Sequence, residues 1–187
     1  MCNVPLLIGW VLAAQATYLA AVGCVLGVVA TSSNPLTVGG SPILIAVALV
    51  LLAASLVSAG AVAVNVAMCG NGGCSIFANR ALALAVSLTI LLTAMAVATA
   101  LMLPALVVPF GGSVVAAVLA GTMIASAIAY SVLVDALRSL EVCVTTANSV
   151  ASTVAVVLSV IGIVIALVVG SVAVTSSGAP PCTGLNC

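Results

Sequence analysis

The chain has 187 residues, of which 66% are hydrophobic and only 2% are charged. Its charges are two arginines, one aspartate and one glutamate, and it contains no lysine and no histidine. Because soluble domains carry about 25% charged residues, this composition excludes a water-exposed globular fold and predicts an integral membrane protein. The apolar composition predicts the lipid bilayer as a partner. Because the chain has no basic patch, we expect no nucleic acid partner.

Five segments have the length and apolar character of membrane-spanning helices, which need about 20 residues to cross a hydrocarbon core of about 30 Å. Breaks rich in proline and glycine separate them, because these residues interrupt helices. We predict an all-α polytopic transmembrane helical bundle of five spans, within a single integral membrane domain of residues 1–187. The uncharged break after the third span leaves a four-span bundle as the alternative. The predicted spans are residues 6–30, 43–68, 81–103, 113–134 and 150–175, followed by a Pro- and Cys-containing tail at 176–187.

Five spans place the two termini on opposite sides of a multi-pass membrane protein. Both arginines, Arg80 and Arg138, fall in loops on the N-terminal side. Because cytoplasmic loops carry an excess of lysine and arginine, we expect a cytoplasmic N-terminus and an extracytoplasmic C-terminus. The first segment lacks the basic start of a signal peptide and is predicted to be a retained helix.

Small residues recur along several spans at spacings of three and four residues, and in the fifth span they lie opposite β-branched residues. Alternating three and four is typical of left-handed helix packing near +20°. Lipid provides no hydrophobic drive for helices to associate, so close approach over small side chains must provide it. We predict helix-packing roles for Gly23, Gly27, Gly162 and Gly170, either within the bundle or against neighbouring proteins. The stripes are Gly9, Ala13, Ala16, Ala20, Gly23, Gly27 and Ala30 in the first span, Ala54, Ser58, Ala61 and Asn65 in the second, Ala117, Gly121, Ala125 and Ala129 in the fourth, and Asn148, Ser152, Ala155, Ser159, Gly162, Ala166, Gly170 and Ala173 in the fifth.

Few polar residues interrupt the spans, and buried polar groups often mark function in membrane proteins. One interpretation is a small polar cavity on the N-terminal side, lined by Gln15, Asn65, Tyr130 and Asp135. The alternative is that each side chain only forms a hydrogen bond within or between helices. Asp135, Arg138 and Glu141 follow one another at intervals of three, which favours ion pairs within a helix if the fourth helix continues beyond the membrane.

Seven cysteines include two pairs with four intervening residues, which are candidates for disulfides: Cys69 with Cys74, and Cys182 with Cys187. A redox couple, a metal site or free thiols are the alternatives for the first pair, although the spacing departs from the Cys-x-x-Cys of thiol oxidoreductases and zinc sites. Cys24, within the first span, is predicted to be a small packing residue.

No catalytic motif accompanies these features, so we expect no enzyme, no catalytic residue, no metal and no cofactor. The leading hypothesis is a structural or accessory membrane protein that packs against other membrane subunits or copies of itself, in a complex or in the envelope of a particle. One alternative is a small transporter or channel with a weakly polar path. A second alternative is a membrane thiol oxidoreductase that uses Cys69 and Cys74.

Overall fold

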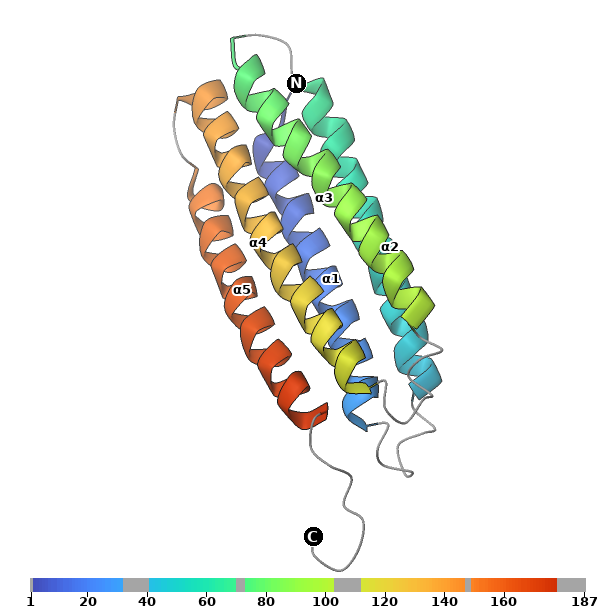
Figure 1. The fold of residues 1–187 in the computed structure, drawn as a ribbon. Coiled ribbons are helices and arrows are strands. Elements are labelled where there is room, and N and C mark those ends of the chain that lie inside the picture. The colour runs from blue at the N-terminus through green and yellow to red at the C-terminus, as the bar shows by residue number, and fades with distance from the viewer. Residues whose placement is uncertain (1, 32–40, 70–72, 103–111, 147–148, 178–187) are drawn as a thin grey trace, which may run out of the picture.

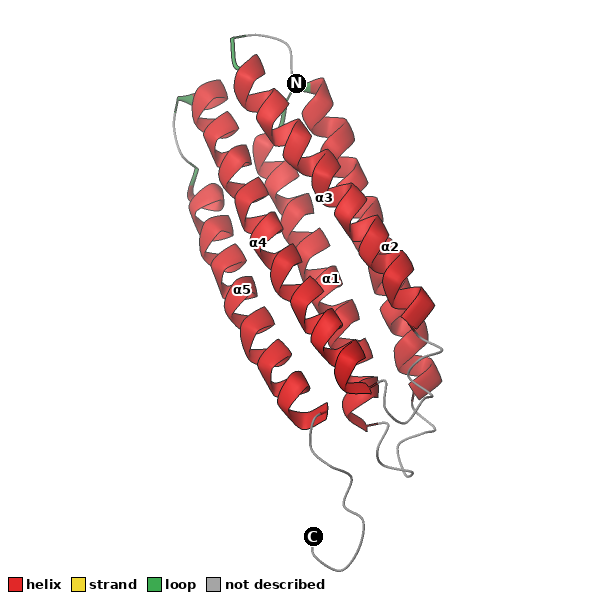
Figure 2. Ribbon diagram, in the orientation of Figure 1, coloured by secondary structure: helices red, strands yellow, loops and turns green. Residues whose placement is uncertain are grey.

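The computed structural model describes residues 2–31, 41–69, 73–102, 112–146 and 149–177. Within these ranges the chain is helical and contains no strand (Figure 2). All five helices are long and apolar enough to cross a membrane, which confirms the predicted transmembrane bundle and indicates a multi-pass membrane protein. The helices are α1 (Val4–Thr31), α2 (Ser41–Met68), α3 (Ser75–Met102), α4 (Gly112–Thr145) and α5 (Val150–Ser177) (Figure 1).

Two helices extend well beyond their predicted spans, whereas the ends of the other three lie within two residues of the prediction. α3 begins six residues earlier than expected, at Ser75, and α4 continues past residue 134 to Thr145. Neither extension contains proline or glycine, and the α4 extension includes the good helix formers Ala, Leu, Arg and Glu. Of the charged residues expected in loops, Arg80 therefore lies near the start of α3, and the other three lie on the last turns of α4.

The helices form a four-membered ring with a fifth helix on its outside. α1 packs against α2 and α4, and α3 packs against the same two helices, which closes the ring. α5 packs against α4 and α1 (Figure 1). Because the number of helices is odd, α1 begins at one end of the bundle and α5 finishes at the other (Figure 1).

The α5 stripe of small residues faces the bundle, which is one of the two placements expected for it. Its six members from Ser152 to Gly170 are buried, whereas the opposite face is exposed; Asn148 and Ala173 lie outside the side chains that the structure describes. A Cβ added at Gly170 would lie 3.1 Å from the Cβ of Ala120 on α4, and one added at Gly162 would overlap Gln15 of α1. Gly162 and Gly170 of α5 therefore lie where this helix meets α1 and α4. The exposed face consists of Val150, Val154, Val157, Ile161, Val164 and Val168.

The stripe on α1 has the same spacing but faces outward. Gly9, Ala13, Ala16 and Ala20 are exposed, and Cβ atoms added at Gly23 and Gly27 would meet nothing within 4 Å. Packing within the bundle is therefore the wrong interpretation for Gly23 and Gly27. The reason is that α1 contacts its neighbours through the opposite face, which carries larger side chains such as Val11, Tyr18 and Val22.

Because α5 approaches α4 closely, we predict that substitutions at two glycines differ markedly in their effect on stability. Gly170→Val should lower the free energy of unfolding by about 1–3 kcal/mol, because the added side chain overpacks the contact with Ala120. Gly121→Val is the matched control, since a Cβ there meets nothing within 4 Å. Thermal unfolding of both variants in detergent measures the difference, and equal stability of the two would contradict this packing.

Candidate functional site

Two disulfides cross-link helices at the end of the bundle where α1 begins. Cys2, which precedes α1, is bonded to Cys69, which follows α2, across 67 residues of sequence. Cys74, which precedes α3, is bonded to Cys143 near the end of α4, across 69 residues. Each disulfide therefore joins the ends of two antiparallel helices that pack against each other.

The expected bond between Cys69 and Cys74 is thus wrong, although both residues do form disulfides. Cys69 continues α2 alongside the start of α1, and Cys74 leads into α3 alongside the end of α4. Helix packing therefore presents each thiol with a partner from the neighbouring helix rather than from its own loop. The predicted pair of Cys182 and Cys187 lies outside the described residues.

The disulfides also bear on the redox and metal interpretations. A metal-binding or nucleophilic cysteine must be a thiolate, and the four cysteines at this end are bonded in pairs. Among the described residues no group of three or more potential metal ligands lies together. Cys24 is the free cysteine of the described chain, and it is partly buried on α1.

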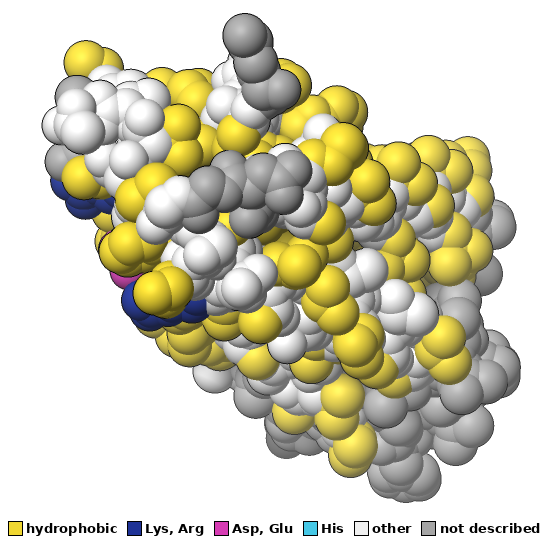
Figure 3. Space-filling view, turned by 90° about the horizontal axis from the view of Figure 1, so that it is seen from above, with side chains coloured by type: hydrophobic (Ala, Val, Ile, Leu, Met, Phe, Trp, Pro, Cys, Tyr) yellow, Lys and Arg dark blue, Asp and Glu magenta, His cyan; other side chains and the backbone are white. Residues whose placement is uncertain are grey.

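The charged side chains lie toward this same end of the molecule. Figure 3, which views the end from above, shows basic and acidic side chains toward one edge. Asp135 and Arg80 are exposed, whereas Glu141 is only 2% exposed. Its Oε2 atom forms no hydrogen bond in the described chain. Glu141 follows buried Leu137 by four residues, and Leu137 follows buried Leu133 by four, which places Glu141 on the core face of α4.

The four residues of the predicted polar cavity do not line one cavity. Gln15 and Tyr130 are buried, but Asn65 and Asp135 are exposed. The Asn65 side chain donates to the Ala61 carbonyl oxygen of its own helix at 2.7 Å. The alternative interpretation, in which polar groups serve helix packing, describes these contacts better.

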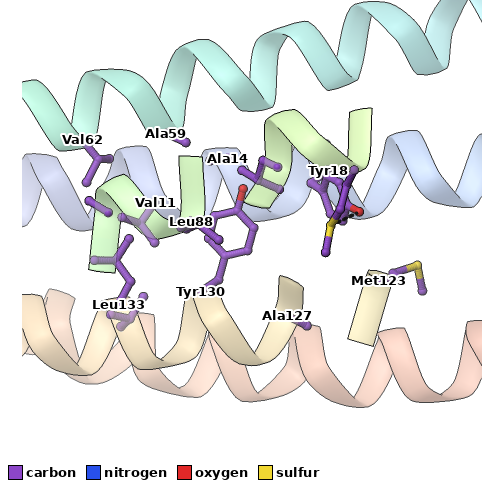
Figure 4. Packing of buried hydrophobic residues seen from close by; sticks show 14 of the residues in the cluster. Val11, Ala14, Tyr18, Ala59, Val62, Leu88, Met123, Ala127, Tyr130 and Leu133 are labelled. Atoms are coloured by element: carbon purple, nitrogen blue, oxygen red, sulfur yellow. Dashed lines mark hydrogen bonds between the residues drawn. The ribbon is translucent and has the colours of Figure 1, made fainter. Parts of the chain in front are cut away.

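A polar contact that the sequence did not indicate joins three helices in the core. Tyr130 projects from α4 toward α1 (Figure 4), and its hydroxyl lies 3.2 Å from the Ser55 hydroxyl of α2. Ser55 donates to the Ala14 carbonyl oxygen of α1 at 3.0 Å. Farther along α1, the Tyr18 hydroxyl donates to the Met95 sulfur at 3.1 Å. Serine occurs at many positions of these spans, so its spacing in the sequence did not predict this contact.

A groove lies beside Gln15 at the junction of α1 and α5. It encloses about 490 Å³, and Gln15 is the polar side chain among its nine lining residues. The Gln15 side chain is 3% exposed, and its Nε2 donates to the Ser159 carbonyl oxygen at 3.5 Å. The absence of a side chain at Gly162 leaves the space that the amide occupies.

Comparison with known proteins adds no functional evidence. Neither a family model, nor a curated protein, nor a solved structure matches this chain.

The disulfide pairing can be tested directly. Peptide mapping of the unreduced protein should recover Cys2 linked to Cys69 and Cys74 linked to Cys143. Cys2→Ser and Cys143→Ser should each lower the free energy of unfolding by about 2–4 kcal/mol, because each releases a long closed loop. Cys24→Ser is the control and should leave stability unchanged, and a peptide linking Cys69 to Cys74 would refute the pairing.

Proposed function

We propose that this protein is a structural or accessory subunit that packs against other membrane proteins through the outward face of α1. The observation that supports this proposal is the stripe from Gly9 to Gly27, whose small residues face away from the core. The stripe extends for about 27 Å along the helix axis, which is close to the full thickness of a hydrocarbon core.

The outward faces of α1 and α5 differ in a way that supports this proposal. A helix face that meets only lipid has no need of small side chains, and the exposed face of α5 carries valine and isoleucine. Small side chains allow another helix to approach the backbone closely, which is how helices gain packing energy in lipid. The alternating spacing of the α1 stripe suits a partner helix that crosses at about +20°.

The two alternatives have less support. A transporter needs polar groups that converge on a path, and two of the four predicted residues, Asn65 and Asp135, are exposed instead. A thiol oxidoreductase needs two cysteines that exchange electrons with each other, and Cys69 and Cys74 each have a different partner.

We also propose that the N-terminal end of the bundle faces an oxidising compartment. Disulfides form and persist in the periplasm, the ER lumen and extracellular space, and are rare in reducing cytosol. Two disulfides lie at this end, both between cysteines distant in sequence. This orientation is the reverse of the one expected from Arg80 and Arg138, a bias that rests on two residues.

The packing proposal predicts that bulk on the α1 face disrupts assembly without unfolding the protein. Gly23→Leu with Gly27→Leu should weaken association with native partners at least about tenfold, because the side chains hold the partner helix away. Both positions are open, so thermal unfolding should be unchanged. Native purification followed by mass spectrometry measures the bound partners.

The matched control is Val157→Leu with Val164→Leu on the exposed face of α5. This variant should retain its partners. A wild-type protein that purifies as a monodisperse monomer without partners would refute the packing proposal.

The orientation proposal predicts sided labelling of the cysteines. In sealed vesicles of known sidedness, a membrane-impermeant thiol reagent should label Cys2, Cys69, Cys74 and Cys143 only from the oxidising side. Labelling should require prior reduction, because disulfide sulfurs do not react as thiols. Labelling from the cytoplasmic side without a reductant would contradict this orientation.

A further inference from the structure

The groove between α1 and α5 has the features of a ligand site. Its volume of about 490 Å³ falls within the range of small-molecule pockets, which are mainly apolar with a few placed polar groups. Its outer margin consists of exposed residues, so a molecule can enter from the surrounding bilayer. The lining residues are Leu12, Gln15, Ala16, Leu19, Ala20, Leu158, Ile161, Gly162 and Ile165.

The Gln15 side-chain amide does not use all of its hydrogen-bond donors and acceptors. Among the described residues its side chain makes one hydrogen bond, the long contact from Nε2 to Ser159. A glutamine amide has two N–H donors and an oxygen acceptor, so Oε1 and one N–H are left for an occupant of the groove. An amide surrounded by apolar groups gains most from such a partner, because no water competes for it.

The position of Gln15 restricts the chemistry of that partner. Gln15 lies about 16 Å along the helix axis from Val4, near the middle of a hydrocarbon core of about 30 Å. A charged headgroup is too costly at this depth, and none of the lining residues carries a compensating charge. A single hydroxyl, in contrast, both donates and accepts, and so matches Oε1 and the remaining N–H together.

The walls of the groove favour a lipid chain over a partner helix. Leu12 and Leu19 stand on the α1 side, and three branched side chains of α5 stand on the other. Helix pairs in membranes approach over small residues, whereas these walls are bulky. A helix with side chains is about 10–12 Å across, while a single alkyl chain is far thinner and can lie between the two rows.

We propose that this groove binds an uncharged lipid alcohol, a long-chain or isoprenoid alcohol that can enter the hydrocarbon core. Its hydroxyl donates to Gln15 Oε1 and accepts from Nε2, and its chain lies against Leu19, Leu158 and Ile165. This site does not depend on packing through the α1 stripe, with which it shares only Ala16 and Ala20.

Photolabelling of the full-length protein in phosphatidylcholine vesicles tests the site. The probes are a diazirine-bearing hexadecanol and its methyl ether, which has lost the hydroxyl donor. The alcohol should label peptides spanning residues 12–20 and 158–165, and the ether should label them about five- to tenfold less, the effect of one hydrogen bond. Excess unlabelled hexadecanol should displace the probe, and hexadecane should not.

Variants on α1 supply a second readout. Gln15→Leu should reduce alcohol labelling about five- to tenfold. Thr17→Val is the matched control, because the Thr17 hydroxyl donates within its own helix, to Ala13 at 2.8 Å, and is absent from the groove. This control should label like the wild type.

Three results would overturn the proposal. Equal labelling by the alcohol and the ether would show an apolar groove filled by bulk lipid, and this comparison needs no variant to fold. Full labelling of a folded Gln15→Leu variant would exclude the amide as the recognition group. A photoreactive amino acid at position 161 that cross-links to protein in native membranes would show that a partner helix occupies the groove.

Discussion

Helices that are apolar on every side gain little free energy by exchanging lipid contacts for contacts with each other, unless their backbones approach closely. This constraint determines how the helices of the bundle pack. Along α5 a continuous face of small residues brings that helix against α4 and α1. Gly170 approaches Ala120 so closely that a methyl group would be crowded, and Gly162 leaves room for an amide. Packing energy in lipid comes from such contacts rather than from removal of apolar surface from water.

The few polar groups of the core strengthen the same architecture. Ser55 connects a backbone carbonyl of α1 with Tyr130 of α4, so that one hydroxyl contacts two other helices. At one end, two disulfides join the antiparallel pairs α1–α2 and α3–α4. These contacts tie the four helices of the ring together and leave α5 held by close packing.

The two surfaces with proposed roles are adjacent but differ in shape. The α1 stripe is long and carries only small side chains, which suits a partner helix. The groove beside it has bulky walls and one amide, which suits a thin chain with one polar group. A lipid in the groove would lie alongside a helix on the stripe, and Ala16 and Ala20 would contact both. The lipid would then contribute to the surface that the partner meets.

By itself, the sequence determined the number of spans and the helical class, because apolar length and turn residues are local properties. It located the small-residue face of α5 but left open whether that face meets the bundle or a neighbouring protein. It did not determine which way the α1 stripe faces. In soluble helices the polar face marks the outside, but here both faces are apolar and lipid accepts either. The cysteine pairing and the burial of Glu141 were also decided only by the tertiary structure, because both depend on which antiparallel neighbour lies beside each helix end.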